Sequence, residues 1–192
     1  SPEGALFVSL AGQMARFYDV PSRAGGGLTD SKTVDDQSGS EAMFQLFTTM
    51  LSGIDFIEHG AGIMNSYSTA SPEKFVLDVE RLKYLQRFRE GYNLNDESFA
   101  LDLIGEVEPA DHFLNKRHTL KHAQNEFIIP ELAVRSSFDE WASAGEADAF
   151  SRASDRVDSL LESYERPPLD EDIHSELELY VEKRINEIQG GN

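Results

Sequence analysis

The sequence contains no cysteine among its 192 residues. This absence excludes disulfide bonds, zinc sites built on thiolates and a cysteine nucleophile, and it fits a reducing compartment. No apolar run approaches the roughly 18 residues of a membrane-spanning helix, and no basic and apolar leader opens the sequence. We therefore expect a cytoplasmic protein without a membrane partner.

Basic residues are also scarce. The 17 Lys and Arg residues face 35 Asp and Glu residues, which gives a formal net charge of -18. Because proteins neutralise nucleic-acid phosphates with clustered Lys and Arg, this balance argues against a nucleic-acid partner. The chain is long enough for one domain with a core, but it is shorter than the roughly 250 residues of a complete β/α barrel.

Several familiar motifs are missing as well. The glycines at 25–27 form neither the GxGxxG of a dinucleotide fold nor the GxxxxGK[ST] of a phosphate loop, and no GxSxG elbow is present. His112, His118 and His122 invite a metal interpretation, but the HExxH pattern is absent and Lys121 opposes a cation. We expect surface or hydrogen-bonding histidines and assign no metal ligand.

The clearest positive signal is a repeated order of elements. The first unit comprises strand 20–24, a polar glycine-rich loop at 25–39 and helix 40–51, and the second comprises strand 54–58, loop 59–70 and helix 71–90. This order is typical of β/α units, in which the loops that follow the strands gather on one face and form the site. A helix carrying apolar residues at helical spacing is expected before them, from Ser1 to about Phe17. We expect Ser71-Pro72 to start helix 71–90 and Gly91 to stop it, and its apolar spacing puts Phe75, Val76, Leu85 and Phe88 on the buried side.

Beyond residue 92 the strand signal disappears. We expect helices at about 95–107, 119–126, from 137, 146–165 and 170–188, with a frayed end at 190–192. Ser137 and Glu140 have the spacing of a capping box at the start of the helix from 137. The sequence therefore predicts two regions, residues 1–92 with β/α units and residues 93–192 that are helical and acidic.

The two loops carry the candidate functional residues. Consecutive glycines allow positive φ and close approach, and the Thr, Asp, Ser, Lys and Gln residues that follow supply donors and acceptors. Loop 25–39 is either a small-molecule site or a flexible surface loop. His59 follows a predicted strand, so it is either a proton carrier or substrate contact, or a hydrogen-bonded histidine in the loop wall. Tyr67 and Phe56 are expected to pack rather than to form an aromatic cage.

The sequence resembles the trimethylamine methyltransferase family at these loops. The resemblance is carried by Gly25-Gly26-Gly27-Leu28-Thr29-Asp30-Ser31-Lys32, by Asp36-Gln37 and by His59-Gly60-Ala61-Gly62. It continues in Asp111-His112-Phe113-Leu114 and in His118-Thr119-Leu120-Lys121-His122. It covers nearly the whole chain in the right order, and the chain looks like the C-terminal portion of such a protein.

This resemblance implies an α/β fold, namely the C-terminal part of a TIM-type β/α barrel followed by an acidic, mostly helical region. Residues 1–92 would supply the C-terminal β/α units, and residues 93–192 would pack on the barrel. The implied activity moves a methyl group from a methylamine or a quaternary amine such as glycine betaine to the cobalt of a corrinoid protein. The corrinoid (cobalamin) would be carried by that partner and not bound directly. The chain has only standard residues, which favours the branch of the family without pyrrolysine.

The places of six residues in or beside the two loops suggest a hypothesis for their roles. Asp30 and Glu58 would attract the cation, Lys32 and Gln37 would fix a substrate carboxylate, and His59 would be a polar wall contact. The predicted catalytic residues are Asp30, Lys32 and His59, and the predicted substrate-binding residues are Gln37, Glu58 and Gly27. Transfer from a quaternary nitrogen needs no acid, so the protein would mainly orient the amine and exclude water.

A second interpretation assigns the chain to another class of protein. The short barrel portion and the acidic helical tail would also suit a non-catalytic fragment that serves as an assembly or binding module. Further β/α units upstream of Ser1 would favour the enzyme. Assembly into a homo-oligomer stays open.

Overall fold

The computed structural model describes residues 1–190, and the predicted frayed end falls mainly on residues 191–192, outside them. The fold is mixed but mostly helical, with 58% helix and 5% strand, which fits part of an α/β fold rather than a complete one. It divides into two compact units, Ser1–Asp158 and Ser159–Asn192. None of the described helices is long and apolar enough to cross a membrane.

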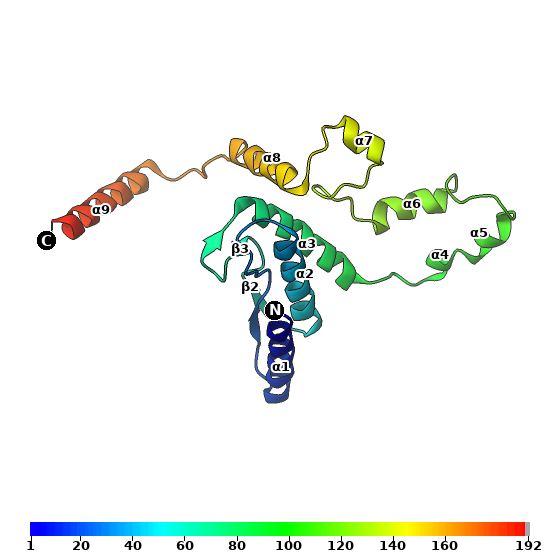
Figure 1. Ribbon diagram of the computed structural model, residues 1–192, viewed down its shortest axis with the longest axis horizontal. Helices are drawn as coiled ribbons and strands as arrows, with labels where there is room; N and C mark the ends of the chain where they lie inside the picture. Colours follow the sequence, from blue (N-terminus) through cyan, green and yellow to red (C-terminus); the bar gives the residue numbers. More distant parts are fainter. Residues whose placement is uncertain (191–192) are drawn as a thin grey trace. The chain divides into compact units, whose positions relative to one another are not determined.

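Figure 1 shows the elements of the described chain and labels most of them. The helices are α1 (Pro2–Tyr18), α2 (Asp36–Leu51), α3 (Pro72–Glu90), α4 (Asp96–Phe99), α5 (Leu101–Glu106), α6 (Arg117–Glu126), α7 (Phe138–Ser143), α8 (Ala149–Glu162) and α9 (Glu171–Gln189). The strands are β1 (Arg23–Gly25), β2 (Phe56–Glu58), β3 (Ile63–Met64) and β4 (Thr69–Ala70).

The predicted β/α order is present in unit 1. Strands β1 and β2 pair in parallel, with Arg23 opposite Phe56 and Gly25 opposite Glu58, and α2 is the crossover between them. Helix α2 packs against α1, α3 and β1, and α2 and α3 run side by side in Figure 1. The loop after β2 contains an antiparallel hairpin, β3 with β4, which the sequence pattern did not predict.

Local capping explains where the long helices begin and end. The side chain of Asp35 accepts a hydrogen bond from the backbone N–H of Ser38, whose side chain accepts one in return, so α2 starts four residues earlier than predicted. Ser71 caps α3 with Pro72 at its first position, and Gly91 ends it at φ 68°. The predicted capping box of Ser137 and Glu140 is confirmed at the start of α7.

Helix α1 contacts its neighbour through small residues. Ala5 and Gly12 are buried, and a Cβ at Gly12 would lie only 2.7 Å from the carbonyl oxygen of Ser52, so glycine permits this close approach. The large apolar residues of α1 remain exposed within the described chain, and they are Leu6, Phe7, Leu10, Met14 and Phe17.

The buried side of α3 differs from the prediction. Phe75 and Phe88 were expected inside, but they are 52% and 60% exposed. Val76 forms an apolar cluster with Leu132 and Ala153. Lys74, Asp78 and Glu80 are buried as well. This helix therefore buries charged side chains together with the expected apolar residues Val76 and Leu85.

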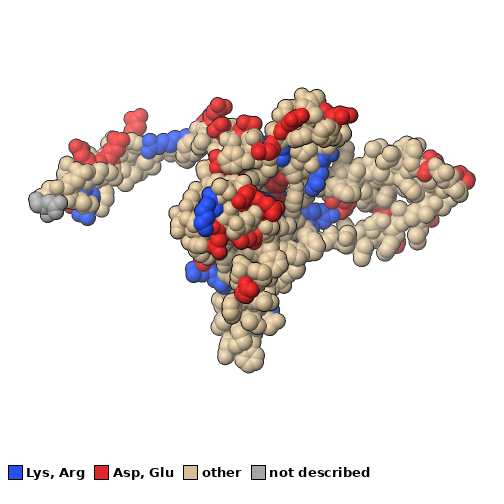
Figure 2. All heavy atoms as spheres, in the orientation of Figure 1, with Lys and Arg blue, Asp and Glu red and all other residues tan. Residues whose placement is uncertain are grey.

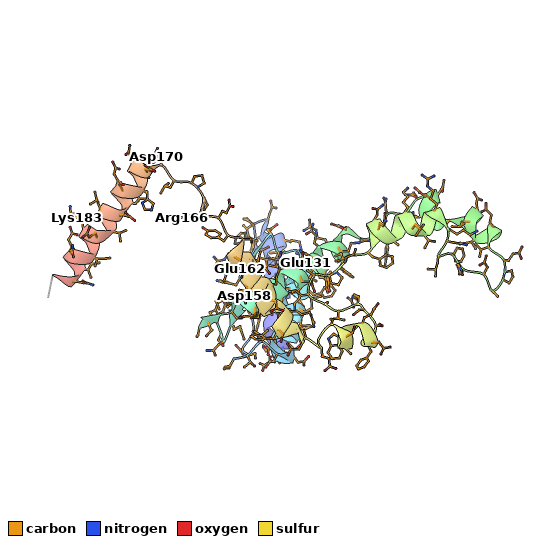
Figure 3. The ribbon with its side chains drawn as sticks, turned by 90° about the horizontal axis from the view of Figure 1, so that it is seen from above. Glu131, Asp158, Glu162, Arg166, Asp170 and Lys183 are labelled. Atoms are coloured by element: carbon orange, nitrogen blue, oxygen red, sulfur yellow. The ribbon has the colours of Figure 1, made fainter. Side chains whose placement is uncertain are left out.

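Glu80 joins α3 to the segment that precedes α7. Its carboxylate accepts hydrogen bonds from the backbone N–H groups of Glu131, Leu132 and Ala133 at 2.7, 2.7 and 2.9 Å. Glu131, labelled in Figure 3, also pairs with Lys83 of α3 and lies 3.5 Å from Arg156 of α8. Part of the helical region thus packs directly on α3.

Two helices of the second half differ in detail from the prediction. The single helix expected at 95–107 is two helices, because Ala100 adopts φ 49° between α4 and α5. Helix α9 begins after Asp170, whose side chain accepts from the N–H groups of Asp172 and Ile173. Figure 3 shows Asp170 at the start of this helix and Lys183 farther along it.

Replacing Glu80 by Ala leaves three backbone N–H groups of the 131–133 segment without their acceptor. Unpaired buried donors are costly, so we expect a loss of about 3 kcal/mol in the free energy of unfolding, measured by urea denaturation. Glu90→Ala, at an exposed carboxylate of the same helix, is the control. Equal stability of the two variants would contradict this anchoring role.

Candidate functional site

The loops that follow β1 and β2 lie against each other, as predicted for β/α units. Gly26 and Gly27 donate their N–H groups to the carbonyl oxygens of Glu58 and His59 at 3.0 and 2.9 Å. Farther along, Ser66 donates its N–H to the carbonyl oxygen of Thr29 at 3.3 Å. The contact is so close that a Cβ at Gly27 would lie 2.4 Å from the carbonyl oxygen of Gly60. Position 27 therefore requires glycine.

A pocket of about 670 Å³ lies beside these loops, among residues of α1, α2 and both loops. Its polar lining includes Asp30, Glu41 and Ser66, and its apolar and aromatic lining includes Leu28, Phe44 and Tyr67. This size is within the range of small-molecule sites. The pocket is the candidate functional site.

Glu41 was missed by the sequence reasoning, although it is the best-connected carboxylate of the pocket. It accepts hydrogen bonds from the Thr29 hydroxyl at 2.6 Å, the Asp30 N–H at 3.0 Å and the Gln37 amide at 3.1 Å. The Thr29 bond, more than the others, lowers the pKa of Glu41 below its ordinary value of 4.5, against the opposing effect of desolvation. Glu41 is therefore an anion at neutral pH.

A signal for Glu41 exists in the sequence. Glu41 lies four residues after Gln37, a spacing at which helical side chains meet. The pair becomes visible only when α2 is taken to start at its Asp35 cap instead of at Ser40.

Asp30 is the predicted catalytic residue that the structure places in the pocket lining. Its carboxylate accepts a hydrogen bond from the Ser66 hydroxyl, which joins the two loops at the pocket wall. Lys32, also predicted, is exposed and donates from Nζ to the carbonyl oxygen of Asp30 at 2.6 Å. Lys32 thus contacts the backbone of Asp30 and is not among the described residues that line the pocket.

None of the other four predicted residues is among the described residues that line the pocket, and the side chains of two of them contact its lining. Gln37 donates to Glu41, and the His59 ring packs edge-on against that of Tyr67 with ring centroids 5.0 Å apart. The carboxylate of Glu58 pairs with Arg23 at 3.1 Å, and the carbonyl oxygen of Gly27 accepts from Lys74 at 2.8 Å. The roles predicted for these residues stay predictions.

Tyr67 has a more exposed position than the packing role expected for it. It is 59% exposed, lines the pocket and has φ 70°. Asn65 and Ser66 before it also have positive φ, at 48° and 51°. Three successive residues in a region that side chains seldom occupy indicate a backbone held by its surroundings.

The three histidines singled out in the sequence lie elsewhere. His118 Nε2 is 2.8 Å from the carbonyl oxygen of Glu97, and the rings of His118 and His122 are 4.2 Å apart. Among residues 1–190, no group of three or more His, Cys, Asp or Glu side chains is placed to hold a metal ion. On the face shown in Figure 2, acidic side chains are spread over the surface among scattered basic ones.

Comparison with known proteins identifies the family. A family model described as trimethylamine methyltransferase matches residues 1–189. The chain belongs to the trimethylamine methyltransferase family. It is 42% identical to a glycine betaine methyltransferase of Desulfitobacterium hafniense over 98% of this chain and 39% of that protein.

Two other relatives have different named substrates. The chain is 34% identical to an L-carnitine:corrinoid methyltransferase of Eubacterium limosum, over 87% of this chain and 35% of that protein. It is 29% identical to a trimethylamine methyltransferase of Methanosarcina barkeri, over 99% of this chain and 38% of that protein. The chain therefore spans well under half the length of these relatives.

The lowered pKa of Glu41 predicts a pH dependence. Its ionised form stabilises the fold above the ordinary value of 4.5, and this contribution disappears as the pH falls through the lower pKa of the folded state. Glu41→Gln should therefore lower the melting temperature at pH 7, and the difference from wild type should shrink below about pH 4.5. Thermal melts between pH 3 and 7 measure this, with Glu106→Gln at an exposed carboxylate as control. A difference that is constant with pH would contradict the assignment.

Proposed function

We propose that the full-length protein transfers a methyl group from a quaternary amine of the glycine betaine type to the cobalt of a corrinoid protein. The amine would bind in the pocket lined by Asp30 and Glu41. One observation carries the proposal, namely that these two carboxylates share a small-molecule pocket with the aromatic residues Phe44 and Tyr67. The names of the relatives support the reaction class.

The chemistry of the pocket suits a cation that cannot donate a hydrogen bond. A trimethylammonium group is recognised by the charge of carboxylates and by aromatic faces rather than by hydrogen bonds. Glu41 meets this need because its hydrogen bonds keep it ionised. Lys32 and Gln37, beside Asp30 and Glu41, would fix the carboxylate end of the amine.

The corrinoid carried by the partner would accept the methyl group, and the residues of this chain would bind and orient the amine. No proton has to move when a quaternary nitrogen loses a methyl group. The protein therefore contributes by holding the amine in one orientation and by excluding water from it. His59 against Tyr67 would stiffen one wall of the pocket.

We also propose that further β/α units of the full-length protein complete a TIM-type barrel around β1 and β2. A two-stranded parallel sheet is not stable by itself, and parallel strands are normally covered on both faces. A groove of about 630 Å³ between α2, β2 and α3, with Leu46, Ile57 and Leu82 in its lining, offers room for such elements. The exposed apolar residues of α1 support the same proposal. Residues 1–92 would belong to the barrel, and residues 93–192 would pack on it.

Recognition of the cationic head can be tested with a neutral isostere. In 3,3-dimethylbutanoate a carbon replaces the nitrogen of glycine betaine, so the shape is kept and the positive charge is lost. Measured by isothermal titration calorimetry, the full-length protein should bind glycine betaine about tenfold more tightly than 3,3-dimethylbutanoate. This ratio corresponds to a difference in binding free energy of about 1.4 kcal/mol.

Asp30→Asn should reduce this preference to about threefold or less, because the amide keeps the acceptor for Ser66 and loses the charge. Asp102→Asn, at an exposed residue of α5, should leave it unchanged. Equal binding of the two compounds by the wild type would refute recognition of the cation. Binding of neither compound would favour the non-catalytic alternative.

A further inference from the structure

A buried charged cluster on α3 lies against the two loops that build the pocket. Lys74 and Asp78 have fully buried side chains, and that of Arg81 is 22% exposed. None of the three lines the pocket in the described part of the chain. Any effect of these residues on the pocket is therefore transmitted through the groups that they contact.

The contacts of this cluster reach both loops. Lys74 Nζ donates to the carbonyl oxygen of Gly27 at 2.8 Å and to the carboxylate of Asp78. Asp78 also accepts hydrogen bonds from the backbone N–H of Gly62 at 2.9 Å and from Arg81 at 2.6 Å. One ion pair thus fixes the first loop through Gly27 and the second loop through Gly62.

Each of these glycines leads into a wall of the pocket. Gly27 is followed by Thr29 and Asp30, and Gly62 is followed by Ser66 and Tyr67. The two walls meet again where the Ser66 hydroxyl donates to Asp30. The ion pair and this hydrogen bond therefore both join the two walls, in addition to the backbone hydrogen bond from the Ser66 N–H to the Thr29 carbonyl oxygen.

Stability alone does not explain a buried pair of this kind. Taking a lysine and an aspartate out of water is costly. Well-packed apolar residues in the same place often stabilise a protein as much as a buried ion pair does. Burial lowers the pKa of Lys74, and the hydrogen bond to Asp78 opposes that effect. What apolar residues could not supply is a donor for the Gly27 carbonyl and an acceptor for the Gly62 N–H.

We propose that Lys74 and Asp78 are positioning residues, which set the distance between the Asp30 wall and the Tyr67 wall of the amine pocket. The proposal deepens the proposed function and rests on it for the identity of the ligand. The positioning itself is a property of the two loops and can be measured without any ligand.

The test compares two lysines of the same helix in the full-length protein. Lys74→Met removes the buried donor, whereas Lys83→Met removes a half-exposed lysine that pairs with Glu131. Lys74→Met should raise the Kd for glycine betaine about tenfold at a temperature where the variant is folded. Lys83→Met should stay within twofold of the wild type.

Hydrogen exchange supplies the readout that does not depend on the ligand. In Lys74→Met the amides of residues 27–30 and 62–67 should exchange at least tenfold faster, while amides in the middle of α2 keep their wild-type rates. Exchange that accelerates equally throughout unit 1 would indicate a merely structural role and would overturn the proposal. Unchanged exchange in the two loops would overturn it as well.

A second variant covers the case in which Lys74→Met fails to fold. Arg81→Gln keeps the buried Lys74 and Asp78 pair and removes the second cation bound to Asp78. It should raise the Kd about threefold and accelerate exchange in residues 62–67. If the wild type binds no amine, the proposed function fails, and the exchange rates of the variants still decide whether the cluster positions the loops.

Discussion

The ion pair of Lys74 and Asp78 is the interaction on which the arrangement of the two loops depends. Parallel pairing of β1 with β2 brings the starts of the loops together, and a backbone hydrogen bond from Ser66 to Thr29 joins them farther along. The buried pair adds the connection from α3 to both loops, because it binds the Gly27 carbonyl and the Gly62 N–H at once. A helix that a sequence pattern marks as an ordinary amphipathic element therefore determines the geometry of a site formed by other residues.

The pocket gains its electrostatic character from a few hydrogen bonds rather than from the net charge of the chain. Acidic residues are spread over the surface, and most are exposed to water, which screens them. Glu41 differs because Thr29, Asp30 and Gln37 donate to it at the edge of an aromatic-lined pocket. An ionised carboxylate beside aromatic rings would hold a permanently charged amine, which fits the family to which the chain belongs.

Local rules of sequence predicted much of the fold. The Ser71 and Pro72 start of α3, its stop at Gly91 and the Ser137 capping box depend on neighbouring residues, and all were predicted. The β3 and β4 hairpin was missed because strands of two residues carry no periodic signal. Burial of Lys74 could not be predicted either, since its backbone partner Gly27 lies 47 residues away in the sequence. Asp30 was recognised because its loop carries the family resemblance, whereas Glu41 was missed because its importance depends on where α2 begins.

The exposed apolar residues of α1 show what a sequence pattern cannot predict. Their spacing correctly predicts a helix, but spacing does not reveal what covers the apolar side. The most direct test of the central claim is a crystal structure of the full-length protein soaked with glycine betaine. The account predicts the trimethylammonium group within about 6 Å of the Tyr67 ring, between the carboxylates of Asp30 and Glu41. An amine bound at another site, with this pocket empty, would contradict it.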